Sequence, residues 1–135
     1  MILALDVGNT NTVVGGFEGS TLRFSLRMQS DRNKTVDEYV LLLRGLLAEK
    51  EVDLSGVEGG IISSVVPELR YVLGKAMERL TGKTFLVVSN RLDLGGIQIK
   101  MDIPGQVGAD LLVDAAAALS LYQPPLVIFD MGTAT

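Results

Sequence analysis

Three short runs of apolar and β-branched residues stand near the start of the chain. Residues 2–6 form a mostly apolar run, and residues 12–17 and 21–27 have the composition of β-strands. Glu18-Gly19-Ser20 separates the last two runs and has the length and composition of a hairpin turn. Short turns join antiparallel neighbours, so the pattern predicts three consecutive antiparallel strands.

The spacing of apolar residues then changes to that of amphipathic helices. Thr35 and Glu38 fit a capping box, and apolar residues recur every three to four positions behind them, which predicts a helix over about 36–50. Pro67 opens a second helix at a position where its missing N–H does no harm, and Gly82 ends it. The residues expected to line these two helices are Val36, Tyr39, Val40, Leu43, Leu46, Leu47, Leu69, Val72, Leu73, Ala76 and Leu80.

Further strands are expected between and behind these helices. The pattern predicts a buried strand over 59–64, a short strand over 84–88 and a half-exposed strand over 97–101. An Ala-rich helix follows over about 106–121. The expected order of strands and helices is that of an α/β lobe.

A domain boundary is expected at Pro124, after the Ala-rich helix. Residues 1–123 are interpreted as one lobe. Leu126 to Phe129 form another apolar run, and residues 124–135 are interpreted as the first strand and phosphate loop of a second, truncated lobe.

The composition removes several kinds of chemistry. The chain has no cysteine and no histidine, which excludes thiol nucleophiles, disulfides, His-dependent serine triads and the usual His/Cys zinc sites. Lys and Arg total 12 against 16 Asp and Glu, which argues against a broad basic surface for nucleic acid. No apolar run approaches the roughly 18 residues of a membrane span, and no basic segment of a secretion signal precedes the first strand. We therefore expect a cytoplasmic protein.

Two apolar runs end in the same motif. Ile2 to Leu5 lead into Asp6-Val7-Gly8-Asn9-Thr10, and the run before Asp130 leads into Asp130-Met131-Gly132-Thr133-Ala134. A carboxylate at the tip of a strand, followed by a glycine turn, suits a metal-phosphate site, because the turn exposes backbone N–H groups while the Asp holds the cation. The repetition predicts two halves of a phosphate clamp. The alternative for each copy is a simple β-turn with an Asx cap.

The chain resembles the ribonuclease-H-like lobe found in actin and the hexokinases, in which antiparallel strands are followed by alternating helices and strands. More narrowly, it is similar to the type III pantothenate kinases. Four motifs in the same order carry that resemblance: Asp6-Val7-Gly8-Asn9-Thr10, Ser63-Ser64-Val65-Val66-Pro67, Pro104 followed by Gly108-Ala109-Asp110, and Asp130-Met131-Gly132-Thr133-Ala134-Thr135. Family members are about twice this length and have two such lobes, so the resemblance implies that the second lobe is missing here.

The resemblance implies transfer of a phosphoryl group from ATP to the primary hydroxyl of pantothenate, the first step of coenzyme A biosynthesis. It implies that Asp6 is catalytic and holds Mg²⁺, and that Asp110 accepts the proton of the attacking hydroxyl. Asp130 is implied to bind a monovalent cation, K⁺ or NH₄⁺. The residues implied to bind ATP phosphates are Asp6, Val7, Gly8, Asn9, Thr10, Asn11, Thr12, Gly132 and Thr133. The residues implied to bind pantothenate are Met101, Gly108, Ala109 and Asp110.

Two further properties follow from the resemblance. Family members are homodimers, and the wide apolar surface of the Ala-rich helix is the expected contact. Phosphoryl transfer needs both phosphate loops, so the 135-residue chain alone is expected to be inactive.

Simpler roles remain for several of these residues. Asp110 is alternatively only a charge favoured at a helix N-terminus, and Asp114 is expected on solvated surface. Ser63 to Pro67 are expected to shape the turn from strand to helix. A cluster of basic residues is expected on a solvated strand edge and loop, with contact to the nucleotide as the alternative: Arg23, Arg27, Arg32 and Lys34.

The chain departs from the family pattern at two positions. Family members commonly carry Arg after the catalytic Asp, where this chain has Leu111, and many carry Tyr where Met101 stands. A leucine offers no donor to the pantothenate carboxylate. Two other functions therefore stay open: a non-catalytic nucleotide-binding or regulatory module of the same family, and a related kinase that acts on another small acid or a sugar.

Overall fold

The computed structural model describes residues 1–103 and 107–131. The chain divides into two compact units, Met1–Val87 and Val88–Thr135, and each is described by itself. This division precedes the Ala-rich helix, whereas the sequence pattern placed a boundary after it. The assignment of the two lobes stays a prediction.

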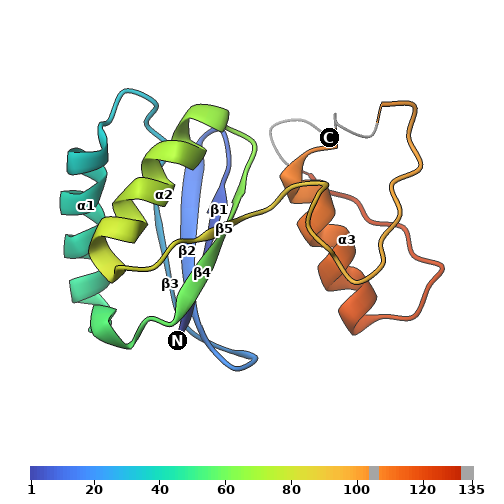
Figure 1. Ribbon diagram of the computed structural model, residues 1–135. Helices are drawn as coiled ribbons and strands as arrows, with labels where there is room; N and C mark the ends of the chain where they lie inside the picture. Colours follow the sequence, from blue (N-terminus) through green and yellow to red (C-terminus); the bar gives the residue numbers. More distant parts are fainter. Residues whose placement is uncertain (104–106, 132–135) are drawn as a thin grey trace. The chain divides into compact units, whose positions relative to one another are not determined.

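The first unit is built on a five-stranded sheet with the order β3-β2-β1-β4-β5 (Figure 1). The strands are β1 (Ile2–Val7), β2 (Asn11–Glu18), β3 (Thr21–Gln29), β4 (Gly59–Ser64) and β5 (Leu86–Val87). The pairs β1–β2 and β2–β3 are antiparallel, and β1–β4 and β4–β5 are parallel. This mixed sheet confirms the predicted α/β class and its ribonuclease-H-like order of antiparallel strands followed by parallel ones.

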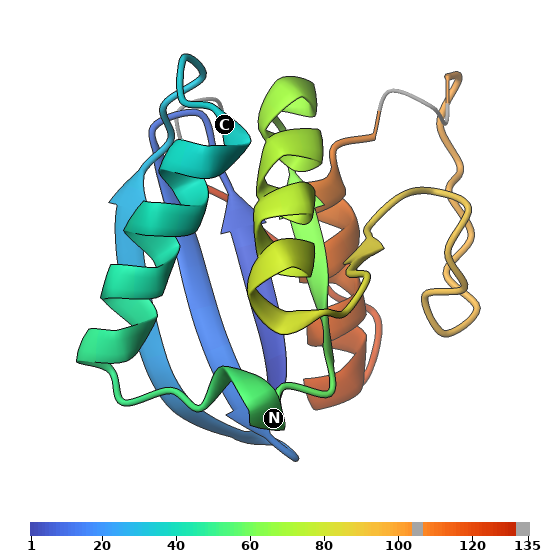
Figure 2. The same ribbon diagram turned by 60° about the vertical axis from the view of Figure 1, so that its left-hand side comes forward.

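Two helices cover one face of this sheet. They are α1 (Val36–Glu49) and α2 (Pro67–Thr81), and they lie side by side in front of the strands in Figure 2. Thr35 and Glu38 form the predicted capping box at the start of α1, and Gly82 ends α2 in the left-handed conformation at φ 69°. A short 3₁₀ turn, η1 (Leu54–Gly56), precedes β4.

The core of the first unit lies between the helices and the sheet. The largest fully buried side chains are Tyr39, Leu3, Leu5, Leu43, Leu47, Ile62, Leu69, Leu73, Met77, Val7, Val14 and Val57. Gly60 lets a ring pack directly on the strand, because a Cβ there would lie 2.2 Å from the Phe85 ring and 2.5 Å from the Leu3 carbonyl oxygen. Residues of β1 alternate about the sheet, so Leu3, Leu5 and Val7 face the helices.

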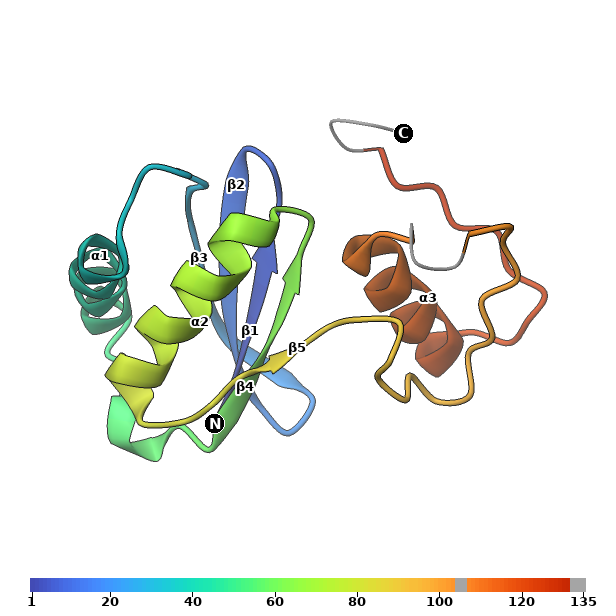
Figure 3. The ribbon, with the colours of Figure 1, turned by 45° about the horizontal axis from the view of Figure 1, so that its top comes forward.

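The second unit contains one helix within its described residues, α3 (Ala109–Leu121), and Figure 3 shows irregular chain before and after it. Two predicted strands are wrong. Residues 97–101 and 126–129 have no strand structure, and no described strand pairs with either. An extended segment becomes a strand only when a neighbour takes up its backbone hydrogen bonds, and composition does not supply that neighbour.

Within the described residues, no helix is long and apolar enough to cross a membrane.

Candidate functional site

The turn between β1 and β2 carries the first of the two repeated motifs. Asp6 is exposed in β1, one residue before its end, and Gly8, Asn9 and Thr10 form the turn. The Gly8 N–H donates to the Asn11 carbonyl at 3.0 Å, and a Cβ at Gly8 would lie only 3.1 Å from that oxygen. Glycine therefore allows the turn to close tightly directly behind the carboxylate.

The turn has backbone N–H donors that the described secondary structure does not use. In the described part of the chain, no backbone hydrogen bond uses the N–H groups of Asn9 or Thr10. Both residues are exposed. Consecutive unpaired backbone N–H groups at a turn are suited to bind an anion such as phosphate.

The segment that links β3 to α1 braces this turn. Ser30 contributes two contacts: its N–H donates to the Thr10 carbonyl at 2.9 Å, and its Oγ lies 2.8 Å from Oγ1 of Thr12. Nη2 of Arg32 donates to Oδ1 of Asn9 at 2.9 Å. The turn is thus held on two sides, and a guanidinium stands beside it.

Arg32 was expected on a solvated loop, and it is exposed as predicted. Its contact with Asn9 was not foreseen, because the two residues are 23 positions apart in the sequence. A basic residue shortly after the third antiparallel strand is the signal that would have found it, since that strand ends beside the β1–β2 turn.

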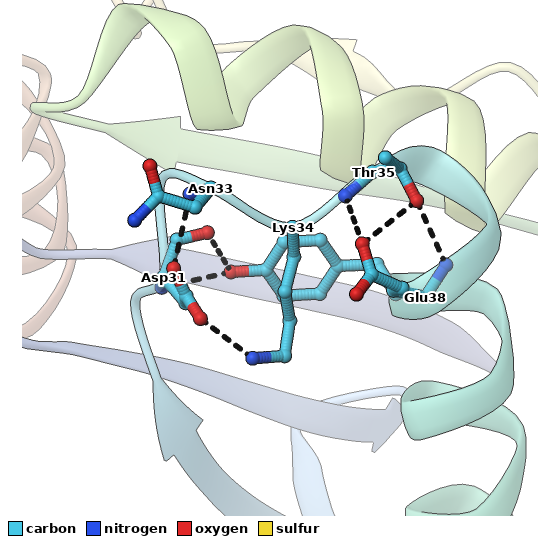
Figure 4. Close-up of polar contacts among 6 residues, drawn as sticks. Asp31, Asn33, Lys34, Thr35 and Glu38 are labelled. Atoms are coloured by element: carbon cyan, nitrogen blue, oxygen red, sulfur yellow. Dashed lines mark hydrogen bonds and ion pairs between the residues drawn. The ribbon is translucent and has the colours of Figure 1, made fainter.

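The same linking segment is anchored to α1 (Figure 4). Nζ of Lys34 lies 2.6 Å from Oδ2 of Asp31, and the Tyr39 hydroxyl accepts from the Asp31 N–H and donates to the Asp31 carbonyl, both at 2.9 Å. Hydrogen bonds from Lys34 and from the Asn33 N–H hold the pKa of the Asp31 carboxyl below its ordinary value. The Asp31 carboxylate raises the pKa of Lys34. Lys34 is therefore paired within the segment, whereas Arg32 faces the turn.

The capping box completes this anchor. Oε2 of Glu38 accepts from the Thr35 N–H at 2.8 Å and from the Thr35 hydroxyl at 2.9 Å (Figure 4). These two bonds lower the pKa of the Glu38 carboxyl, the backbone bond more than the hydroxyl bond. Burial raises the pKa of the Tyr39 phenol.

Asp6 belongs to a row of residues across the sheet face opposite the helices. In the strand register Asp6 is paired with Val13 of β2 and with Ser63 of β4, and Val13 is paired with Arg27 of β3. Paired residues share a face, so a carboxylate, a hydroxyl and a guanidinium are found on one level of the sheet. Thr12 belongs to the other face, where it is fully buried and bonded to Ser30.

The residues predicted for the substrate and the proton acceptor lie in the second unit. Asp110 is half-buried in the first turn of α3, and its Oδ1 accepts from the Leu111 N–H at 2.9 Å. Gly108 is the N-cap residue, and a Cβ there would lie 2.2 Å from Oδ1 of Asp110. The missing side chain of Gly108 therefore leaves room for this carboxylate. Met101 and Leu111 are both exposed.

The second copy of the motif is only partly described. Asp130 is exposed in an irregular segment, and the predicted phosphate contacts Gly132 and Thr133 lie outside the described residues. Pro104 of the third motif lies outside them as well. Ala109, the remaining residue predicted to bind the substrate, begins α3.

The donor set at Asp6 fits one kind of metal. Among the described residues, no three Asp, Glu, His or Cys side chains are grouped as a metal cluster. Mg²⁺ is suited to such a site, because it keeps several waters and is commonly bound by one or two carboxylates together with substrate phosphates. Asp6, with a turn suited to phosphate directly behind it, has that composition.

A separate hollow of about 280 Å³ lies in the first unit, at the sheet edge formed by β5. It is formed by α2 and the segment leading into β5, with Arg70, Tyr71, Lys75 and Phe85 among its lining residues. Of the residues predicted for phosphate or metal, none that the structure describes lines it. The hollow is therefore separate from the β1–β2 turn.

Comparison with known proteins finds a matching family model and similar solved structures, including the following two. A family model described as type III pantothenate kinase matches residues 2–135. The structure of YeaZ from Pseudomonas aeruginosa has 22% sequence identity and a TM-score of 0.46, over 65% of this chain and 43% of that chain. A second structure, described as an uncharacterized protein with similarity to peptidase YEAZ from Pseudomonas aeruginosa, has 20% identity and a TM-score of 0.46, over 65% of this chain and 42% of that chain. The match thus spans less than half the length of each of these proteins.

Proposed function

The chain belongs to the type III pantothenate kinase family, and from this premise we propose that it supplies the first phosphate loop and the Mg²⁺ site of an ATP-dependent pantothenate kinase. The observation that carries the proposal is the β1–β2 turn. It stands directly behind Asp6, its N–H groups at Asn9 and Thr10 are unused in the described part of the chain, and it is braced by the β3–α1 segment.

The turn is proposed to bind the phosphates of ATP. The backbone N–H groups of Asn9 and Thr10, which no backbone hydrogen bond uses in the described part of the chain, supply donors, and the exposed side chains of both residues add polar groups. Arg32 adds a positive charge next to Asn9. Phosphoryl transfer needs little covalent chemistry from the protein, so positioned donors and charges of this kind account for most of the catalysis. Thr12 contributes by holding the turn, because its hydroxyl is bonded to Ser30.

Asp6 is proposed to hold Mg²⁺, directly or through water. The cation supplies neutralisation of the charge that develops on the transferred phosphoryl group. The Asp6 carboxylate fixes the position of this charge relative to the turn, because the two are separated in the sequence by Val7 alone. Asp130 is proposed to hold the monovalent cation, K⁺ or NH₄⁺, together with the loop of Gly132 and Thr133, on the strength of the family resemblance.

Asp110 is proposed as the general base that accepts the proton of the pantothenate hydroxyl. Its carboxylate keeps acceptor capacity beyond the single bond from the Leu111 N–H. Met101, Gly108 and Ala109 are proposed to contact pantothenate beside it. The full-length protein, meaning this chain continued by a second lobe, is proposed to act in the cytoplasm as a homodimer through α3, on which Leu111, Leu119 and Leu121 are exposed.

A calorimetric titration with a non-hydrolysable ATP analogue tests this proposal. The full-length protein is expected to bind the analogue more tightly as Mg²⁺ is raised. Asp6→Asn should weaken this binding, and higher Mg²⁺ should recover part of the loss, because the variant keeps the shape of the side chain but loses its charge. Asp37→Asn is the matched control, since Asp37 lies exposed on α1 in a surface ion pair with Arg79. Binding that does not respond to Mg²⁺ in the parent protein would contradict the proposal.

Leu111 favours a second candidate function, transfer to another acceptor. Its exposed aliphatic side chain follows Asp110 directly and offers no donor to a carboxylate. A panel of small acids and sugars, assayed by acceptor-dependent ADP release, distinguishes the two. Turnover with an uncharged acceptor that exceeds turnover with pantothenate would favour the second candidate.

A further inference from the structure

Ser63 carries a buried hydroxyl without a partner in the described part of the fold. The residue lies in β4 and is only 6% exposed, and its Oγ has no hydrogen-bond partner among the described residues. A buried polar atom without a partner destabilises a fold, and such an atom calls for a specific explanation, commonly a bound water or ion.

The neighbouring serine shows what a purely structural hydroxyl does in this motif. The Ser64 hydroxyl donates to the Val66 carbonyl at 2.9 Å and accepts from the Val66 N–H at 3.1 Å. These bonds shape the turn that leads into α2, the role expected for the whole motif. Successive residues of a strand face opposite sides of the sheet, so Ser63 is on the other face and has no part in that turn.

The strand register brings Ser63 beside Asp6. The two residues are direct partners in the parallel pair β1–β4, so they share a face and a level of the sheet, one strand spacing of about 4.8 Å apart. The structure has no hydrogen bond between the Ser63 hydroxyl and the Asp6 carboxylate. Two polar groups placed in this way are suited to contact a third group between them, such as a water.

We propose that Ser63 is a positioning residue for the cation site at Asp6, with its Oγ accepting a hydrogen bond from a water in the coordination shell of Mg²⁺. The inference rests on the proposed function, because it takes Asp6 as the metal ligand. Mg²⁺ keeps most of its waters, and the waters of a bound cation are strong donors that need fixed acceptors. One carboxylate alone fixes few of them. The buried hydroxyl of Ser63 supplies a second acceptor on a rigid strand.

The test compares three variants of the full-length protein. Ser63→Ala removes the hydroxyl, Ser63→Thr keeps it, and Ser25→Ala is the matched control, an exposed serine of β3 on the same sheet face, three strands from Ser63. Two quantities are measured: the Mg²⁺ concentration at half-maximal binding of a non-hydrolysable ATP analogue, by calorimetry, and the unfolding temperature in EDTA without nucleotide. Mn²⁺ binding, followed by electron paramagnetic resonance, reports on the cation directly.

Ser63→Ala is expected to raise the required Mg²⁺ concentration and to weaken Mn²⁺ binding by about 10-fold, the usual size of an outer-shell effect. Its unfolding temperature in EDTA should equal or exceed that of the parent, because it removes an unpartnered buried hydroxyl. Ser63→Thr should restore most of the cation affinity. Ser25→Ala should change neither the cation affinity nor the unfolding temperature.

The opposite results separate the two proposals. If Ser63→Ala keeps the parent's Mg²⁺ and Mn²⁺ affinities within twofold, or lowers the unfolding temperature in EDTA, Ser63 only fills space and this inference is overturned while the proposed function stands. If the parent protein itself binds the analogue without regard to Mg²⁺, both the proposed function and this inference are overturned.

Discussion

The two copies of the Asp-x-Gly motif have the same local sequence and different surroundings. The copy at Asp6 lies between two paired strands, and residues 30–32 brace its turn. The copy at Asp130 follows an apolar run that pairs with no described strand, and Val127 and Phe129 in that run are about 80% exposed. The same local sequence therefore forms a paired and braced turn where neighbouring strands hold it, as at Asp6. The first copy has these neighbours in this chain, and the second would need a lobe of its own.

The largest expected difference concerns turnover by the chain alone. The 135-residue chain should show no pantothenate-dependent ADP release, while the full-length protein should, because most of the rate comes from donors fixed around the transferred group on both sides. Weak nucleotide binding should survive through Asp6 and the turn behind it. A coupled ADP assay on both proteins at matched concentration makes the measurement. Turnover by the 135-residue chain would show that the second copy functions without a lobe around it.

Asp110→Asn in the full-length protein should lower turnover by about 10²–10⁴-fold, the usual contribution of a general base, with little change in ATP affinity. The amide keeps the shape of the side chain but does not accept the proton. Asp114→Asn, one turn later in α3, is the control and should stay within a few-fold of the parent. If turnover of the Asp110→Asn variant also stays within a few-fold of the parent, Asp110 is only a charge at the helix start.

Arg32→Ala tests the contact between Arg32 and Asn9 that helps to hold the turn of the first copy. It should weaken binding of a non-hydrolysable ATP analogue by about 10-fold, since hydrogen bonds to charged groups contribute roughly 1.5–3 kcal/mol and the exposed position lowers that figure. Arg32→Lys should recover only part of the affinity, because the ammonium lacks the planar donor fork. Arg23→Ala is the control, an exposed arginine paired with Glu18 at 3.0 Å. Equal affinities for the Arg32 and Arg23 variants would remove Arg32 from the phosphate site.

The smallest expected effect is the acid sensitivity of the β3–α1 segment. Asp31 and Glu38 have lowered pKa values in the folded chain, so the unfolded chain binds more protons near and below their ordinary values of about 3.9 and 4.3. Stability contributed by these carboxylates is therefore complete above about pH 5 and is lost as the pH falls through the folded values. Urea denaturation of the 135-residue chain between pH 3 and pH 7 measures this. In the double variant Asp31→Asn, Glu38→Gln, the free energy of unfolding should fall less steeply as the pH is lowered. If it falls as steeply as in the parent, other carboxylates cause the acid sensitivity.

The elements predicted well are those whose signals are local. The turn signal at Glu18-Gly19-Ser20 identified the antiparallel pair β2–β3, and Thr35, Glu38, Pro67 and Gly82 marked the helix ends where the structure has them. The predicted strands at 97–101 and 126–129 failed because strand structure depends on a partner elsewhere in the protein. The Ala-rich helix was predicted, but it starts at Ala109 rather than near residue 106.

The candidate site was predictable to a similar extent. The motif at Asp6 identified the turn, since glycine behind a strand-end carboxylate is a local signal. Two features depended on pairing between distant segments and were not foreseen: the contact of Arg32 with Asn9, and the position of Ser63 beside Asp6. The position of Ser63 could have been predicted. Side chains alternate between the two faces of a strand, so parallel pairing of β1 with β4 assigns Ser63 and Ser64 to opposite faces.

The brace on the β1–β2 turn has a thermodynamic consequence for nucleotide binding. Ser30, Arg32 and the closure from Gly8 to Asn11 hold the loop in one shape before any ligand arrives. A loop that is already ordered loses little conformational entropy when it closes on a phosphate, so more of the contact energy is available as affinity. As the proposed phosphate loop, this turn would be a preorganised receptor, and we expect the association of nucleotide with it to be fast and free of a slow rearrangement.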